Sequence, residues 1–234
     1  HRHRGSVPSR VNPTENTEVT FNGGVWYANY LNSDLGRTQA LGWDTGIDGF
    51  WQVHERVGLQ AFYTYSNEWY DQDSRYRPVI GGVVIDDPLN DWKSKTKNWY
   101  HNGGTRVNVS VIPGVLDFET AYMASFGYEK TTASGVPGVP PGQTGTDGGA
   151  AVDYPLVEAF LNAVTATMSW NVLENVTLWT QYRFEHYHLD DFRIDQLQPF
   201  MPATNPPNSR DIWLGQRIDS YTAHLIGFGV RYSF

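Results

Sequence analysis

Apolar and polar residues alternate along most of this chain with a period of two. Such alternation is typical of β-strands with one apolar and one polar face, and the 3.6-residue period of amphipathic helices is nearly absent. The pattern predicts strands over residues 18–30, 38–53, 57–70, 97–112, 115–130, 156–172, 176–189 and 220–234. The sequence therefore predicts an all-β, antiparallel protein with at least eight strands.

The connections between these strands alternate in length. Residues 54–56, 113–114 and 173–175 form tight turns, whereas 71–96, 131–155 and 190–219 are long and rich in Pro, Gly and Asp; only 31–37 is short on that side. Short periplasmic turns and long extracellular loops are the plan of transmembrane outer-membrane β-barrels. We expect residues 18–234 to form barrel strands. Residues 1–17 are either a tail or the end of a preceding strand followed by a periplasmic turn.

The two phases of the alternation differ sharply in charge. One phase carries residues such as Phe21, Trp43, Tyr63, Leu178 and Phe228, and we expect no charged residue on it. The other phase carries Asp44, Asp48, Glu68, Arg106, Asp117, Glu119, Glu129, Arg183, Glu185 and Arg231. A charge facing lipid at mid-depth costs about 2–4 kcal/mol, so this segregation is expected of a membrane barrel.

A soluble β-sandwich is the alternative, since it would show the same alternation and bury its apolar face. Aromatic residues at both ends of the apolar phase, among them Trp51, Phe118, Trp69 and Trp99, favour lipid because barrels carry aromatic girdles at both interfaces. The pattern leaves the lipid face of 156–172 unassigned.

Composition narrows the function. The chain has 234 residues, net charge −8, 15% aromatic residues and no Cys. The absence of Cys excludes disulfides, Cys-ligated zinc and covalent C-x-x-C-H haem attachment in this chain. The net negative charge, together with the lack of a cluster of basic residues in the sequence, argues against nucleic-acid binding. No hydrolase, metalloprotease or phosphate-loop motif is present, so we expect no enzyme and no catalytic residues.

Two groups of residues are weak candidates for metal binding. His186, His188, Asp190 and Asp191 cluster at one strand end, where His-x-His places both rings on one face. Carboxylates in the first long loop, Asp71, Asp73, Asp86, Asp87 and Asp91, have the chemistry for Ca²⁺ but no EF-hand spacing. The competing interpretations are interfacial histidines and a solvated acidic loop.

The polar phase is also rich in glycine, which has two explanations. Inward glycines let a partner's backbone approach closely, or they relieve strand coiling. On the first explanation the candidate lumen contacts are Asp44, Asp48, Arg106, Asp117, Glu119, Arg183, Arg231, Gly227 and Gly229.

The last third of the chain resembles a known family. Residues 169–178 are a strand, an Asn-bearing turn and a strand; Tyr-Arg-Phe-Glu-His-Tyr follows at 182–187, and the chain closes with Tyr-Thr-Ala-His…Tyr-Ser-Phe over 221–234. This is similar to the C-terminal end of the MtrB/PioB outer-membrane barrels. Phe228, Val230, Tyr232 and Phe234, in phase on the last strand, resemble the signal read by the barrel-insertion machinery.

The resemblance implies a barrel in the bacterial outer membrane that sheathes a multihaem c-type cytochrome in an electron-transfer conduit. It implies haem in the partner and none bound by this chain, with an extracellular cytochrome as a further partner. A lumen that wide needs more than eight strands, because eight strands leave a bore that side chains fill. We therefore expect the C-terminal portion of a larger barrel. The alternatives are a diffusion porin or transporter, and a closed eight-stranded barrel acting as anchor or adhesin.

Overall fold

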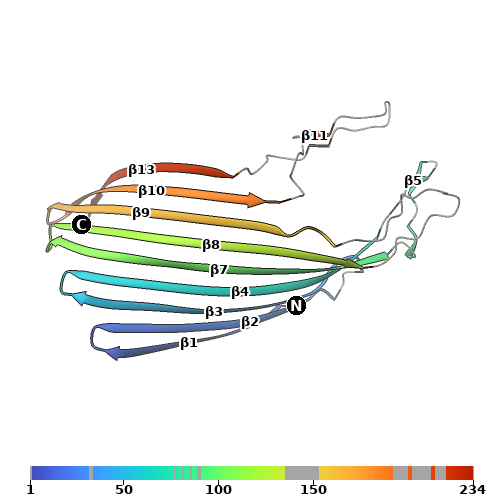
Figure 1. Cartoon of the computed structure of the whole chain (residues 1–234), viewed down its shortest axis with the longest axis horizontal. Helices are drawn as coiled ribbons and strands as arrows, with labels where there is room; N and C mark the ends of the chain where they lie inside the picture. The colour runs from blue at the N-terminus through green and yellow to red at the C-terminus, as the bar shows by residue number, and fades with distance from the viewer. Residues whose placement is uncertain are drawn as a thin grey trace.

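The protein forms one antiparallel sheet of nine strands. The computed structural model describes residues 2–31, 34–75, 77, 79–80, 82–84, 86–88, 91–134, 153–191, 200–201, 212–213 and 220–233. In the sheet the strands lie side by side in chain order, β1-β2-β3-β4-β7-β8-β9-β10-β13 (Figure 1). This arrangement confirms the predicted all-β, antiparallel architecture.

At the short-turn end of the sheet, the strand bounds agree closely with those predicted from the alternation. The sheet strands are β1 (Arg2–Thr14), β2 (Thr17–Asn29), β3 (Gly36–His54), β4 (Val57–Arg75), β7 (Asp91–Ile112), β8 (Leu116–Ser134), β9 (Val157–Leu173), β10 (Val176–Asp190) and β13 (Tyr221–Tyr232). Two short ladders lie outside the sheet: β5 (Val79–Ile80) pairs with β6 (Val83–Val84), and β11 (Phe200–Met201) with β12 (Ile212–Trp213). No helix in the described ranges is long and apolar enough to span a bilayer.

The first strand, β1, raises the number of strands in the sheet from the predicted eight to nine. β1 pairs with β2 from Arg2↔Ala28 to Thr14↔Thr17, so 2–14 is a full strand and not a tail. Because β2 is hydrogen-bonded to both β1 and β3, it has no free edge for β13. The eight predicted strands therefore do not close on themselves. The sheet is open over the described residues, with β1 and β13 at its edges.

Several strands are longer than predicted at the long-connection end. β4 continues to Arg75, β7 starts at Asp91 and β8 continues to Ser134, so the predicted loops 71–96 and 131–155 begin or end inside strands. Most of 131–155 and 190–219 lies outside the described residues. The extra residues were missed because apolar residues no longer alternate there, as expected of strands that rise above the bilayer.

Cross-strand register confirms the two faces. Tyr182 pairs with Ile226 and Ala166, while its neighbour Arg183 pairs with Leu225 and Thr165 on the opposite face. The register also assigns the ambiguous strand: Phe160, Val164 and Met168 of β9 share the apolar face, together with Glu158 and Asn162. We call this apolar side the outward face and the other the concave face.

The outward face is left uncovered by the rest of the described chain. Phe228 is 83% and Ile226 76% exposed, and the buried apolar residues in the described part are only Ala28, Ala40, Val157 and Ala163. A soluble sandwich would bury such a face under a second sheet. An uncovered apolar face on a single sheet is instead the arrangement of a barrel wall in lipid.

Candidate functional site

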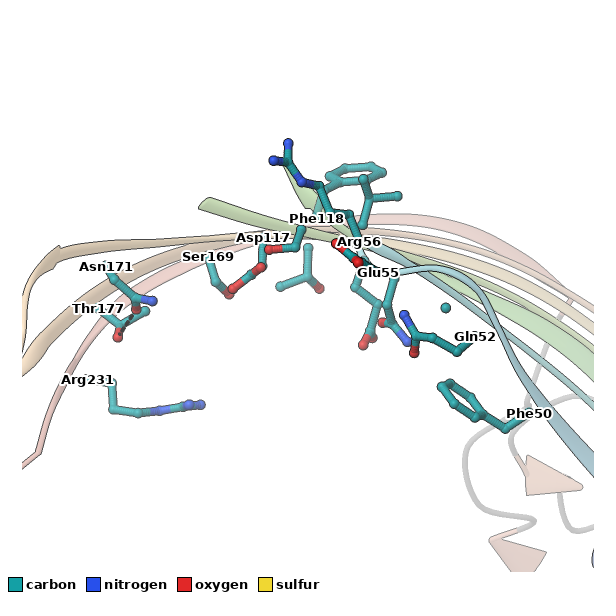
Figure 2. A pocket seen from close by; sticks show the side chains of 16 residues that line it. Phe50, Gln52, Glu55, Arg56, Asp117, Phe118, Ser169, Asn171, Thr177 and Arg231 are labelled. Atoms are coloured by element: carbon teal, nitrogen blue, oxygen red, sulfur yellow. Dashed lines mark hydrogen bonds between the residues drawn. The ribbon is translucent and has the colours of Figure 1, made fainter. Parts of the chain in front are cut away.

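The concave face carries the charged residues predicted for the lumen. A hollow of about 570 Å³ lies at its short-turn end, and its lining includes Gln52, Asp117, Glu119, Ser169 and Arg231. Figure 2 shows Asp117, Ser169, Asn171, Thr177 and Arg231 on the inner side of the arched sheet. Six strands, β3, β7, β8, β9, β10 and β13, therefore bring polar groups from distant parts of the sequence together.

The predicted lumen charges interact with one another. Arg106 Nε lies 3.7 Å from Glu119 Oε1 across β7 and β8, and Arg183 Nη2 lies 2.5 Å from Glu185 Oε1 along β10. The Glu185 carboxylate also accepts a hydrogen bond from the Tyr221 hydroxyl. The side chains of Arg106, Glu119 and Arg183 are 39–49% exposed and that of Glu185 is 17% exposed. Solvent-exposed pairs contribute little to stability, and the Arg106–Glu119 pair stays accessible to a ligand or partner.

The other two acidic residues predicted to face the lumen, Asp44 and Asp48, lie on β3, farther from its short-turn end. Asp48 accepts a 2.9 Å hydrogen bond from Gln60 Nε2, and Asp44 pairs with Gly24 and Ser66 on the neighbouring strands. All seven predicted charged contacts thus share the concave face with Gly227 and Gly229.

Aromatic rings on the concave face are the feature that the sequence analysis missed. Rings lie against the glycines of adjacent strands, where an added Cβ would come within 2.5–3.1 Å of them: Trp26 over Gly42, Phe50 over Gly58, Phe62 over Gly104, Tyr100 over Gly127 and Trp179 over Gly229. Rings that cover cross-strand glycines are a known device for fixing register in curved sheets.

This packing bears on the two explanations for the inward glycines. At Gly229 the space that a Cβ would fill is taken by Trp179, and Gly227 contacts the same ring at 3.4 Å. A molecule in the lumen would meet the indole of Trp179 there and not bare backbone. The cross-strand Trp–Gly pairing was not visible in the sequence, because it requires the register of β10 against β13.

Several polar groups on the outward face are paired within the sheet. Tyr63 bonds His101, Tyr122 bonds Asn162 and Tyr182 bonds His224, each at 2.7 Å. Thr45, Thr120 and Thr180 donate to backbone carbonyls of neighbouring strands. Lipid offers no hydrogen-bond partners, so internal pairing is what a lipid-facing surface requires.

The predicted metal ligands are also engaged with neighbours. His186 and His188 lie on the same face of β10, as predicted, and their Nδ1 atoms lie 3.0 Å from Thr222 Oγ1 and 3.1 Å from Ser220 Oγ. Within the described residues no group of three or more His, Asp or Glu side chains is placed to hold a metal, including around Asp190 and Asp191.

Two aspartates of the first long connection form ion pairs with arginine side chains. Arg75 bonds both Asp86 and Asp91, and Arg77 bonds Asp86. The Arg75 guanidinium lowers the pKa of both carboxyl groups below the ordinary range, and the two aspartates raise the pKa of Arg75.

The last strand carries the predicted insertion residues. Phe228, Val230 and Tyr232 share the outward face of β13, where they pair with Thr180, Leu178 and Val176. Phe234 lies outside the described residues.

Comparisons with known proteins agree with this geometry. The model of the family described as "Putative outer membrane beta-barrel porin, MtrB/PioB" matches residues 1–234. A search of curated proteins finds no match.

Two solved structures match this chain, and the first of them is similar in fold. The structure of "Copper transporter OprC" gives a TM-score of 0.61 at 13% identity over 99% of this chain and 35% of that chain. The chain therefore spans about a third of that barrel protein's length. The outer membrane protease OmpT from Escherichia coli gives a TM-score of 0.31 at 10% identity over 100% of this chain and 83% of that chain.

The family match covers the whole chain, and the sheet has the uncovered apolar face and polar concave face of an outer-membrane barrel wall. The protein is thus a β-barrel protein of the bacterial outer membrane and belongs to the MtrB/PioB family.

Proposed function

We propose that this protein forms part of a wide outer-membrane barrel whose lumen sheathes a multihaem c-type cytochrome. The barrel would insulate the haems from lipid and set their position, while the cofactors of the partner carry the electrons. The observation that carries the proposal is the concave face. It joins a polar hollow, ion pairs and aromatic rings packed over glycines on one wall.

The charges of the concave face suit a protein partner. Arg106 with Glu119 and Arg183 with Glu185 present both signs within two neighbouring regions of the wall. Mixed, half-exposed charges fix the orientation of a docked protein more than they add affinity. Asp117 and Arg231 extend this pattern to the periplasmic end, where a periplasmic partner would enter.

The open edges of the sheet support a barrel larger than nine strands. Backbone groups at a free strand edge cannot remain unpaired in the bilayer core, so β1 and β13 require neighbouring strands. We propose that further strands close the wall, which gives a lumen wide enough for a folded protein and not only for side chains.

Co-purification tests the proposal directly. The barrel, extracted from native membranes in mild detergent, should carry a partner that stains for covalent haem. Its conductance in a planar bilayer should be low while the partner is present and should rise when the partner is removed.

A barrel isolated intact and haem-free from native membranes, with a steady open conductance, would overturn the proposal. It would favour the diffusion porin that the polar concave face also permits. The mass of the intact barrel separates the size classes, since about 26.5 kDa would contradict a larger wall.

A further inference from the structure

The four lysines of the chain lie together on one part of the outward face. The sequence contains Lys93, Lys95, Lys97 and Lys130 and no other lysine, whereas its 13 arginines are spread along the chain. Lys97 pairs directly with Lys130 across β7 and β8, and Lys95 and Lys93 follow on the next two outward positions of β7. We call these four residues the lysine patch.

The patch marks a sharp boundary on the outward face. Immediately toward the membrane, Trp99 pairs with Tyr128 and their rings stack with centroids 5.6 Å apart. Aromatic residues of this kind lie at the membrane–water interface of barrels. The patch therefore begins one cross-strand pair above the aromatic belt, about 7 Å further along the strands. On the long-connection side, this is the level of lipid headgroups in the outer leaflet.

The sequence prediction that the outward face carries no charge is therefore wrong at this end. Lys97 falls within the predicted strand 97–112 and shares the phase of Trp99. The correction has a physical reason, because the headgroup region tolerates charges that the hydrocarbon region excludes.

Two of the four lysines have carboxylate partners and two do not. Lys93 Nζ lies 3.6 Å from Asp73 and Lys95 Nζ 3.6 Å from Asp71. Among the described residues, no carboxylate lies within ion-pair distance of Lys97 or Lys130. Lys97 and Lys130 therefore have no counter-ion among the described residues. Because like charges directly opposite each other in a sheet are destabilising, an anion between the two ammonium groups would relieve their repulsion.

A hollow of about 520 Å³ lies between these residues, with Lys95, Lys97, Lys130, Trp99, Asn67 and Thr132 in its lining. All six point to the outward face, so the hollow opens toward lipid and not toward the lumen. Ammonium groups, an amide and a hydroxyl are donors for phosphate oxygens, and Trp99 offers an apolar wall below them. The nearest outward carboxylate on β9, Glu158, pairs with Tyr128 on the membrane side of Lys130.

We propose that the lysine patch binds the phosphate group of a phosphorylated glycolipid of the outer leaflet. The ammonium groups of Lys97 and Lys130, with Lys95 beside them, face the phosphate. The acyl chains run down the uncovered apolar face below the Trp99–Tyr128 pair. A lipid is favoured over free phosphate because the same hollow continues into the lipid-facing surface, and clusters of basic residues beside a membrane attract anionic headgroups.

The test compares lipid retention by the full-length barrel protein and its variants. Protein is reconstituted in nanodiscs that contain a bis-phosphorylated or a dephosphorylated lipid A, and retained lipid is counted by native mass spectrometry. We expect a preference for the phosphorylated lipid in the unmodified protein. In Lys97→Gln/Lys130→Gln that preference should fall by about tenfold or more, since each basic residue contributes to headgroup binding.

Two controls separate charge from folding. Lys97→Arg/Lys130→Arg keeps both charges and should retain the preference. Arg10→Gln/Arg56→Gln also removes two charges, but both residues lie at the short-turn end of the sheet, away from the lysine patch, so the preference should change less than twofold. Gel migration of unheated samples confirms that each variant is folded.

Three results would overturn the inference. One is equal retention of the two lipids by the unmodified protein. Another is an unchanged preference in Lys97→Gln/Lys130→Gln. The third is competition by millimolar inorganic phosphate, which would assign the site to a free anion. None of these results depends on a cytochrome partner. The test of this inference is therefore independent of the test of the proposed function.

Discussion

The outward and concave faces use the same strands and treat polar groups in opposite ways. On the outward face of the spanning region, His224 is paired with a neighbouring side chain and Thr180 with a backbone carbonyl. On the concave face, Arg106 and Glu119 are charged, half-exposed and loosely paired. The difference shows that one face is built for a medium without hydrogen-bond partners and the other for water or a protein.

The largest expected effect is a difference in the free energy of unfolding between two variants. Each variant places an arginine at one of two adjacent positions, one on the outward face and one on the concave face. Val164 faces outward and Thr165 faces inward in the middle of β9. Val164→Arg should lower the free energy of unfolding in lipid by about 2–4 kcal/mol, and Thr165→Arg should change it by less than about 0.5 kcal/mol. Urea unfolding in vesicles measures both. Equal losses would contradict the assignment of the two faces.

The next effect tests whether aromatic rings and glycines set the packing of the concave face. A Cβ on Gly104 would lie 2.5 Å from the Tyr122 carbonyl oxygen and 2.7 Å from the Phe62 ring, whereas one on Gly103 has ordinary contacts of 3.5 Å. Gly104→Ala should destabilise the barrel by about 1–3 kcal/mol because the backbone must shift. Gly103→Ala, measured in the same unfolding assay, should be near neutral. A neutral Gly104→Ala would show that the close packing is not needed.

The strands and their faces could be predicted from sequence because a period of two is a local signal. Phe62 over Gly104 and Trp179 over Gly229 could not, since these contacts depend on register between strands joined by long connections. Inward aromatics beside short turns, such as Phe50 over Gly58, were hidden for another reason. An aromatic residue in an alternating pattern looks the same whether it meets lipid or covers a glycine on the next strand.

Part of the candidate site could likewise be predicted from the sequence, and part could not. The face of Asp117 and Arg231 followed from strand parity, but their meeting in one hollow depends on strands β8 and β13, which are distant in sequence. The strand ends at Arg75 and Asp91 were missed because alternation fades above the bilayer.

A smaller effect tests the pairing of polar groups on the outward face. Tyr182→Phe removes the hydroxyl that lies 2.7 Å from His224 Nδ1 and leaves the imidazole without this partner. The expected loss is about 1 kcal/mol. Tyr128→Phe is the control, because the Tyr128 ring stacks on Trp99 and should keep that contact. Similar losses in the two variants would assign the effect to the ring environment and not to the hydrogen bond.

The smallest effect lies outside the membrane, where charges meet water. Arg75 lowers the pKa of Asp86 and Asp91. The ion pairs should therefore hold the connection at neutral pH and release it only as the pH falls below the ordinary aspartate pKa of about 4 and through the lowered values. Hydrogen exchange of the β5–β6 ladder (Val79–Ile80 and Val83–Val84) should rise over that range, and Arg75→Gln should show the raised exchange already at neutral pH. Faster exchange at high pH alone, corrected for intrinsic rates, would contradict this sign.

The most direct test of the account uses two adjacent residues on opposite faces of β9. These 234 residues contain no cysteine, so Ser169→Cys on the concave face and Met168→Cys on the outward face each add one defined attachment point, and the protein without either substitution is the labelling control. With a photo-crosslinker attached in native membranes, Ser169→Cys should yield a crosslinked product that stains for covalent haem, while Met168→Cys should yield none. Haem-stained products from both positions, or from Met168→Cys alone, would contradict a lumen that encloses the cytochrome.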